Sequence, residues 1–388
     1  MKVDLKISGG RIIDPAAGVD EIQDLYIKGN RIIAMPDNEV PEPAKTVNAA
    51  GCIVTPGLID FHSHFFCDGS EWGISPDSSF LPVGVTTAVD MGSAGSANYE
   101  CFAKLTNCMS RMRTFSFLNV SPGGLTSSQY EENIDPRVFN RERIESLFEK
   151  YQGKIIGLKV RQSQEIAGTL GLKPLEATLE IAEQLGCPVV VHTTKPAGKA
   201  EDIADMLRPG DIYAHLYNNL GSTILEADGK LKNSVVAARK RGVLFDSANG
   251  RVHFNAAVAT RALAQGFSPD IISTDLVSAT AYSDYVYGLP YIMMQFLGLE
   301  MSLHQVIEAC TATPALILGQ QGKLGTLQAG ALADVAIFDL RQKETLINDY
   351  FGNPLQLKYW LVPQMTILDG KIVYRQIDFC KLNTSPNN

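Results

Sequence analysis

The stretch PGLIDFHSH, residues 56–64, contains the feature that decides the fold. Its largely apolar run predicts a buried strand, and the run is broken at its end by His62 and His64. Residues two apart on a strand point to the same side, so both imidazoles face one place. A strand that ends in paired imidazoles indicates a metal-binding position.

Four other short apolar runs also end in a residue that is able to bind a metal. They are IIGLKVR with Lys159, PVVVHTT with His192, DIYAHLYN with His215, and IISTDL with Asp275. Neutral imidazoles and carboxylates are ligands that suit zinc. Lys159 is the exception, because a free ammonium is repelled by metal ions and lysine is rarely buried without a partner.

Strand and helix patterns alternate through the middle of the chain. Helical stretches such as RERIESLFEKYQ and PLEATLEIAEQLG separate eight strand candidates, at residues 57–62, 85–90, 113–118, 155–160, 188–192, 212–216, 243–247 and 271–275. Eight such units predict an α/β fold of the (β/α)8 TIM-barrel type, in which the carboxyl ends of the strands form one catalytic mouth. A doubly wound sheet is the alternative, but no G-x-G-x-x-G or Walker A loop follows an early strand.

Both ends of the chain differ from the middle, because they contain short β-rich runs separated by glycine. KVDLKISGG and DLYIKGNRIIAM lie near the start, and KIVYRQIDF lies near the end. We therefore expect residues 1–55 and 325–388 to form one composite β-sandwich domain, and residues 56–324 to form the barrel.

Composition narrows the class of protein. The chain has 388 residues, 45% of them hydrophobic, and a formal net charge of −8. An acidic protein of this kind attracts neither nucleic acid nor an anionic membrane, so the expected partner is a small-molecule substrate. No apolar run resembles a signal peptide or a membrane span, which predicts a cytoplasmic protein. Large enzymes often associate through closed symmetry, and we expect a homo-oligomer.

The strand-end residues, together with two longer motifs, resemble the amidohydrolase superfamily. The motifs are P-G-L-I-D-x-H-x-H from Pro56 to His64, and G-x-L-x-x-G-x-x-A-D-x-x-I-F from Gly325 to Phe338. The resemblance covers nearly the whole chain and is strongest to the deacetylase-like group often labelled dihydroorotase.

The resemblance implies a centre of two divalent metal ions, with zinc expected. His62, His64 and Asp275 would hold the more buried ion, and His192 and His215 the more exposed one. Lys159, carboxylated by carbon dioxide to a carbamate, would bridge them. A hydroxide shared by both ions would attack a carbonyl carbon, and Asp275 would carry the proton to the leaving group.

One position departs from the resemblance. Dihydroorotases have an arginine two residues after the second histidine, where this chain has Phe66. Arg161, two residues past Lys159, is the expected replacement for binding a substrate carboxylate. Further substrate contacts are expected from Tyr217, Asn218 and Asn249.

These residues predict a deacylase that cleaves an amide or ester bond in a small carboxylate-bearing compound. The alternative is a cyclic amidohydrolase of the dihydroorotase or hydantoinase type. A deaminase or a non-catalytic oligomeric homologue is a weaker alternative. His253 is expected on a surface loop, Phe65 and Phe66 in the pocket wall, and Asp246 either beside the metal site or as a core carboxylate.

Overall fold

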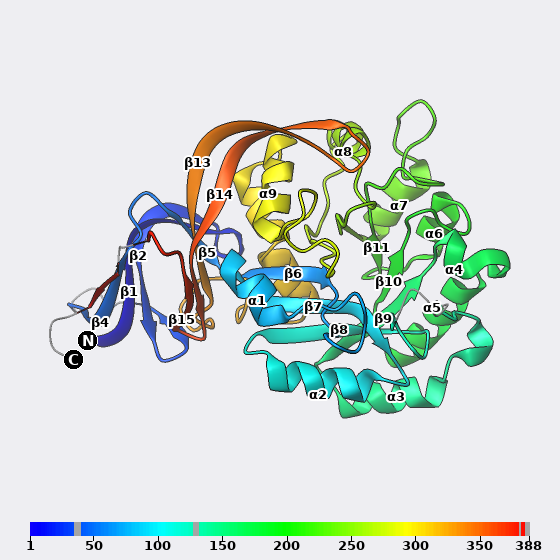
Figure 1. The fold of residues 1–388 in the computed structure, drawn as a ribbon, viewed down its shortest axis with the longest axis horizontal. Helices are drawn as coiled ribbons and strands as arrows, with labels where there is room; N and C mark the ends of the chain where they lie inside the picture. The colour runs from blue at the N-terminus through cyan, green and yellow to red at the C-terminus, as the bar shows by residue number, and fades with distance from the viewer. Residues whose placement is uncertain (35–39, 127–131, 380–381, 385–388) are drawn as a thin grey trace.

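The structure is a computed structural model that describes residues 1–34, 40–126, 132–379 and 382–384. A barrel-like α/β part lies beside a smaller β part, and the two ends of the chain meet in the latter (Figure 1). The predicted fold class is confirmed.

The α/β part is built on a parallel sheet of seven strands in the order β12-β11-β10-β9-β8-β7-β6. The strands are β6 (Leu58–Ser63), β7 (Val85–Gly95), β8 (Arg113–Asn119), β9 (Ile155–Arg161), β10 (Val189–His192), β11 (Ile212–Ala214) and β12 (Leu244–Asp246). Their side chains are buried on both faces. In β10, Val189 and Val191 pack towards the helices, whereas Val190 lies in the barrel interior with Phe61 and Phe117. Strands that are buried on both faces have nearly continuous apolar sequences.

The expected eighth strand, residues 271–275, is not a regular strand, which corrects the sequence prediction. Two isolated parallel bridges connect this segment to its neighbours, Asp246 to Ile271 on one side and Ser63 to Leu276 on the other. The Asp275 backbone N–H donates to the carbonyl of His62 at 2.7 Å. Asp275 has a positive φ of 52° and so leaves the extended conformation. The segment nevertheless closes the barrel between β12 and β6.

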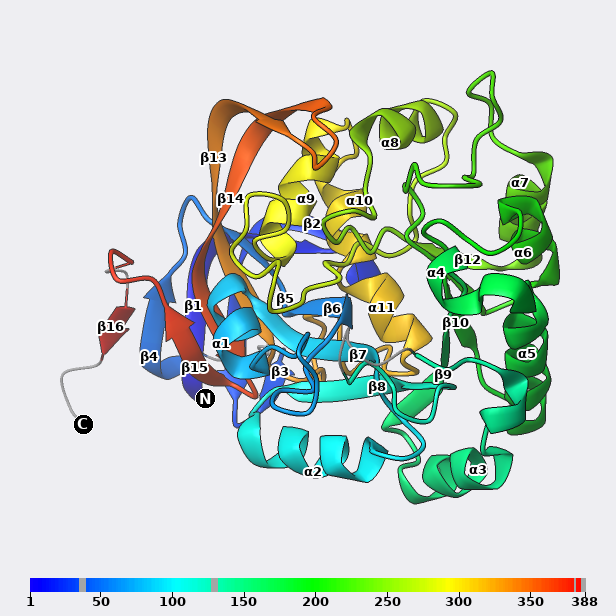
Figure 2. The ribbon, with the colours of Figure 1, turned by 45° about the vertical axis from the view of Figure 1, so that its right-hand side comes forward.

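Helices cover the outside of the parallel sheet (Figure 2). They are α1 (Pro76–Phe80), α2 (Tyr99–Met109), α3 (Arg141–Lys150), α4 (Gln164–Ala167), α5 (Lys173–Leu185), α6 (Ala200–Met206), α7 (Asn233–Arg241), α8 (Ala256–Leu263), α9 (Leu289–Gly298), α10 (Leu303–Ala309) and α11 (Ala312–Ile317). Among the described residues, no helix combines the length and the apolar character that crossing a membrane requires.

The β part combines strands from both ends of the chain in a single nine-stranded sheet. Its path runs β15-β14-β13-β5-β1-β2-β3, while β4 pairs with β1 and β16 pairs with β4. The strands are β1 (Lys2–Asp14), β2 (Val19–Lys28), β3 (Arg31–Ile33), β4 (Glu42–Asn48), β5 (Ile53–Pro56), β13 (Val335–Asn348), β14 (Pro354–Leu368), β15 (Lys371–Arg375) and β16 (Leu382–Thr384).

Strands β13 and β14 are much longer than the short strands expected from the sequence, with 14 and 15 residues. They form a hairpin that leaves the β part, arches over α9 and ends near α8 (Figure 1). The backbone N–H of Leu361 contacts the sulfur of Met294 on α9 at 3.0 Å. At the tip, the Asp349 carboxylate accepts the N–H of Ala256 on α8 at 2.8 Å. The hairpin is therefore anchored along its length.

An ion-pair network joins the bottom of the barrel to the β part. Arg113, the first residue of β8, pairs with Asp334 just before β13 and with Asp369 just after β14. The Asp334 side chain is only 5% exposed, and burial raises its pKa to about 6 despite the opposing effect of Arg113.

We predict that Arg113→Met lowers the free energy of unfolding by about 3 kcal/mol at neutral to alkaline pH, because it leaves a buried carboxylate unpaired. The folded pKa of Asp334 lies above the ordinary value of about 3.9, so its contribution to stability is lost as the pH rises through the folded pKa. Without Arg113 the folded pKa rises further, and the loss should shrink towards pH 5. Urea unfolding at about pH 5 and about pH 8 measures both effects.

The control is Arg141→Met, since Arg141 and its partner Glu180 are both well exposed. It should change stability by less than about 1 kcal/mol. Equal losses in the two variants, or a loss for Arg113→Met that does not depend on pH, would contradict the prediction.

Candidate metal centre

The six residues predicted from strand ends converge at one mouth of the barrel. A pocket of about 270 Å³ there is lined by five of them, His62, His64, Lys159, His192 and Asp275. The sixth, His215, is fully buried directly behind, with its ring 4.2 Å from that of His192 and 5.2 Å from that of His62. Residues spread over more than 200 positions of sequence thus form one cluster.

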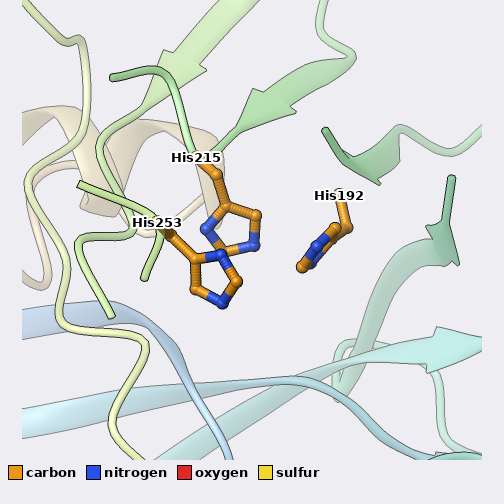
Figure 3. A group of neighbouring side chains, drawn as sticks. All are labelled: His192, His215 and His253. Atoms are coloured by element: carbon orange, nitrogen blue, oxygen red, sulfur yellow. The ribbon is translucent and has the colours of Figure 1, made fainter. Parts of the chain in front are cut away.

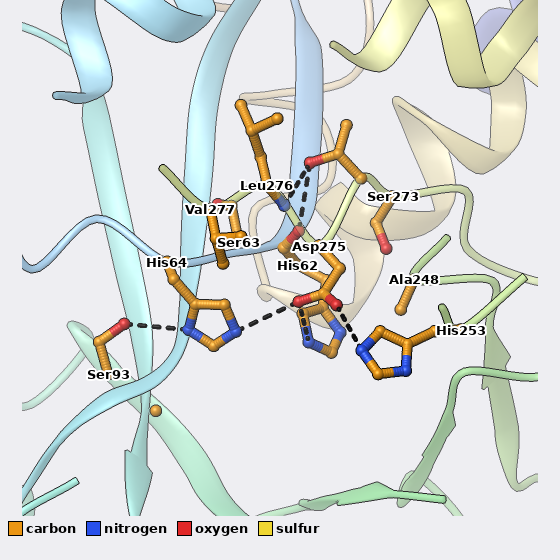
Figure 4. Close-up of polar contacts among 12 residues, drawn as sticks. His62, Ser63, His64, Ser93, Ala248, His253, Ser273, Asp275, Leu276 and Val277 are labelled. Atoms are coloured by element: carbon orange, nitrogen blue, oxygen red, sulfur yellow. Dashed lines mark hydrogen bonds and ion pairs between the residues drawn. The ribbon is translucent and has the colours of Figure 1, made fainter. Parts of the chain in front are cut away.

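The first group consists of His62, His64 and Asp275 (Figure 4). The Nε2 atoms of His62 and His64 lie 3.5 and 3.2 Å from the same carboxylate oxygen of Asp275. Their Nδ1 atoms face the other way, to Asp246 at 2.9 Å and to Ser93 at 3.0 Å. Partners of this kind fix the orientation of a ligating histidine. Asp246 therefore lies beside the candidate metal site. The sequence had left open whether it lies there or serves as a core carboxylate.

The second group consists of His192, His215 and His253 (Figure 3). The ring centroids of His192 and His253 each lie 4.2 Å from that of His215, and they lie 5.1 Å from one another. The Nδ1 of His215 contacts the carbonyl oxygen of Ala248 at 2.9 Å, and the Nδ1 of His253 contacts the hydroxyl of Thr194 at 2.8 Å.

The placement of His253 corrects the expectation of a surface loop. Its Nε2 lies 3.5 Å from the second carboxylate oxygen of Asp275, so it faces both groups. Gly250 allows this approach, because a Cβ at that position would lie 2.5 Å from the His253 ring and 2.7 Å from the Asp275 carboxylate. In the sequence, Gly250 lies between the end of β12 and His253. This glycine was the feature that could have indicated the close approach of His253.

Backbone conformation turns two of these side chains into the mouth. His215 follows β11 with a φ of 67°, and Asp275 has a φ of 52°. Residues with positive φ are uncommon outside glycine, although aspartate and histidine tolerate this region better than most. Held strain of this kind is typical of functional sites.

Lys159 is the most unusual member of the cluster. Its side chain is 2% exposed, and among the described residues its Nζ has no hydrogen-bond partner. The Nε2 of His215 is likewise buried and unpartnered. Burial lowers the pKa of Lys159 to about 8, although the carboxylates of Asp275 and Asp246 oppose it.

Four of the imidazoles are favoured in their neutral form. Burial is the main cause that lowers the pKa values of His62, His192 and His215 well below the ordinary value, and it lowers that of His253 to about 4. Neutral imidazoles, a carboxylate and two unpartnered nitrogens are a donor set that suits divalent metal ions. The residues therefore fit the metals that the sequence predicted.

Two arginines, Arg161 and Arg251, stand at the rim of the pocket. Arg161 pairs with Glu132 at 2.9 Å, and Glu132 in turn accepts a hydrogen bond from Asn119 at 2.8 Å. Trp72, Leu125 and Val277 supply apolar surface nearby. The pocket is thus positively charged at its rim and apolar on one wall.

The other predicted substrate contacts do not line this pocket, which corrects their expected placement. Tyr217 is fully buried and donates to the carbonyl of Phe267 at 2.8 Å. Asn218 donates to the carbonyl of His215 at 2.9 Å, and Asn249 donates to Gln295 on α9 at 2.9 Å. All three follow strand ends, but their side chains stabilise the loops instead of facing the mouth.

Phe65 and Phe66 also lie outside the pocket lining. Both are buried against Phe102 of α2, with ring centroids 5.8 and 5.4 Å away. Both side chains belong to the apolar cluster that the sheet forms with the surrounding helices.

Comparison with known proteins agrees with this arrangement. The chain is 32% identical to a deacetylase of Agrobacterium fabrum over 354 residues, which cover 90% of this chain and 86% of that protein. It is 25% identical to a dihydroorotase of Geotalea daltonii over 435 aligned positions, covering 95% of this chain and 99% of that protein.

A solved structure described as an adenine deaminase matches with a TM-score of 0.87 and 27% identity, covering 96% of this chain and all of that one. The model of the amidohydrolase family matches residues 53–373, which include the whole barrel and the β13–β14 hairpin. The chain belongs to the amidohydrolase family.

Proposed function

We propose that the protein is a binuclear metallohydrolase that removes an acyl group, such as acetyl, from a small carboxylate-bearing amide or ester. The observation that carries the proposal is the buried, unpartnered Nζ of Lys159 between two groups of imidazoles. Burial disfavours an ammonium there, whereas a carbamate, formed from the neutral amine and carbon dioxide with release of a proton, would offer two oxygens to metal ions.

The proposed ligand sets follow the two groups of side chains. His62, His64 and Asp275 would hold one ion, and His192 and His215 the other, with the Lys159 carbamate between them. Zinc is the proposed metal, since imidazole and carboxylate ligands suit it. When bound, the ions would lower the pKa of water so that it can act as the nucleophile at neutral pH, and they would polarise the substrate carbonyl.

Asp275 is the proposed catalytic residue. Its two oxygens face His64 and His253 at 3.2 and 3.5 Å, so it reaches across the mouth. It would take the proton of the nucleophile and deliver it to the nitrogen or oxygen of the leaving group. Asp246 holds His62 from behind and keeps its Nε2 directed at the site.

The relatives favour deacylation over the alternatives. Two deacetylases are 32% and 31% identical to this chain, whereas two dihydroorotases are 25% and 24% identical to it. Phe66 stands where dihydroorotases have a substrate-binding arginine, and it is buried away from the pocket. A cyclic amidohydrolase remains the second candidate, supported by a dihydroorotase structure with a TM-score of 0.84. The cytoplasmic location and the homo-oligomer remain predictions.

We predict that the zinc-loaded protein releases acetate from N-acetyl or O-acetyl carboxylic acids and does not open dihydroorotate or hydantoin rings. His62→Ala should lose bound zinc, measured by elemental analysis, and its hydrolysis should fall to background. The control is His304→Ala on α10, which removes a histidine outside the site. Ring opening without acetate release would favour the cyclic amidohydrolase, and full activity of His62→Ala would refute the mechanism.

A second prediction concerns Lys159. Protein equilibrated with isotope-labelled bicarbonate should show a carbamate signal by NMR, and Lys159→Met should lose both that signal and part of its zinc. Lys154→Met is the matched control, because Lys154 lies just before the same strand and donates to the carbonyl of Thr114. A carbamate signal that persists in Lys159→Met would place the modification elsewhere.

A third prediction concerns Asp246. Asp246→Asn removes the charge that holds the Nδ1 of His62, so zinc affinity should fall by about 10- to 100-fold. Competition with a chelator measures this affinity in the absence of turnover. Asp228→Asn, at an exposed position, should leave the affinity unchanged. Equal affinities for all three proteins would mean that Asp246 does not support the metal site.

A further inference from the structure

The two arginines at the rim of the pocket differ in whether their charge is compensated. Arg161, at the end of β9, pairs with Glu132, whose side chain is only 4% exposed. Asn119 holds the other oxygen of Glu132, so this carboxylate is fixed in place. The positive charge of Arg161 is therefore largely neutralised before any substrate arrives.

Arg251 has no such partner. It follows β12 by five positions and lines the same pocket as His62, Lys159 and Asp275. Within the described ranges of the chain, no ion pair or hydrogen bond of its guanidinium is found. The guanidinium carbon lies 5.3 Å from the centroid of the Tyr350 ring.

Tyr350 belongs to the tip of the β13–β14 hairpin, and the tip is firmly held. Asp349 accepts hydrogen bonds from the backbone of Ala256 and of Asn353, both at 2.8 Å, and from the Asn353 amide at 2.9 Å. The Tyr350 ring also packs edge-on against Tyr285 at 5.6 Å. The position of the Tyr350 ring beside Arg251 is thus fixed by the hairpin.

Asp349, a carboxylate that shares a hollow with Arg251, forms no ion pair with it among the described residues. Asp349 lines a small hollow of about 10 Å³ together with Arg251 and Tyr350. However, its oxygens already accept the backbone and amide hydrogen bonds of the hairpin tip, including the N–H of Phe351 at 2.9 Å. Arg251 is exposed, so its donors are free for a ligand that enters the pocket.

We propose that Arg251 binds the carboxylate of the substrate and thereby sets its specificity, and that Tyr350 is a positioning residue for Arg251. The planar guanidinium matches a carboxylate with two parallel hydrogen bonds, and its stacking on an aromatic ring leaves those donors available. This inference rests on the proposed function and replaces Arg161 as the expected carboxylate-binding residue. Arg161 instead pairs with Glu132.

The experiment uses matched pairs of N-acetyl amino acids and their primary amides, of both enantiomers, with the zinc-loaded protein. Arg251→Met should lower kcat/KM for the acids by about 10- to 100-fold, since hydrogen bonds to a charged group are lost. The value for the amides should change by less than about twofold. Arg161→Met should change kcat/KM for the acids and for the amides by the same factor. Arg261→Met, at an exposed arginine on α8 outside the pocket, is the control for removing a positive charge.

Tyr350 is tested by rescue. Tyr350→Phe keeps the ring and should preserve the ratio of kcat/KM for acids over amides, whereas Tyr350→Leu should lower that ratio. Equilibrium binding of the same acids and amides to the metal-free protein, with and without Arg251→Met, needs no turnover. It therefore separates this inference from the proposed function.

If no compound is hydrolysed but acids still bind more tightly than amides in an Arg251-dependent manner, the proposed function fails and the role of Arg251 stands. If acetyl compounds are hydrolysed while Arg251→Met affects acids and amides equally, or affects neither, the role of Arg251 is wrong. If Arg161→Met lost the preference for acids and Arg251→Met kept it, Arg161 would be the carboxylate-binding residue and the inference would be overturned. Absence of any acid preference in binding would overturn it as well.

Discussion

The arrangement of the mouth depends on the burial of one amine without a partner. Lys159 extends from an apolar strand into a space surrounded by imidazoles and carboxylates, and no described side chain accepts its hydrogen bonds. A buried, unpaired polar group costs free energy, so a sequence retains one only where it serves a purpose. His215 shares this condition, since its buried Nε2 has no partner among the described residues and burial lowers its pKa. Without bound ligands the cluster is a source of instability; with metal ions its donors would be satisfied together.

The barrel must be closed for this cluster to exist, and closure is achieved by little regular structure. The segment 271–276 contacts β12 and β6 through isolated bridges. Thr274 donates to the buried Asp60 from its hydroxyl at 2.6 Å, and the Asp275 N–H bonds to the carbonyl of His62. These contacts fix Asp275 relative to His62 and His64. Backbone hydrogen bonds on both sides, such as those from Ser247 to Ile271 and from His64 to Leu276, together with the Thr274 side chain, thus close this seam without a regular strand ladder.

The sequence predicted the barrel, the composite β part and the convergence of six residues, because buried parallel strands are apolar runs and their ends meet at one mouth. It failed where side-chain direction matters. Tyr217, Asn218 and Asn249 follow strand ends as His215 does, yet hydrogen bonds to loop backbone or to α9 turn them away from the pocket. His253 was missed for the opposite reason: its loop folds back over Gly250, and only the tertiary structure reveals this approach. The length of β13 and β14 was missed because exposed strand residues carry little apolar pattern.

The hairpin of β13 and β14 gives the β part a role beyond packing. Because it crosses α9 and is bonded to α8 through Asp349, it brings Tyr350 to Arg251, which lines the pocket. Loops after barrel strands usually determine specificity in this fold. Here a residue of such a loop contacts a segment nearly 100 positions further along the chain, which belongs to strands of the other sheet. A change in hairpin length or tip sequence would then alter the charge presented to the substrate while the metal-binding groups stayed in place.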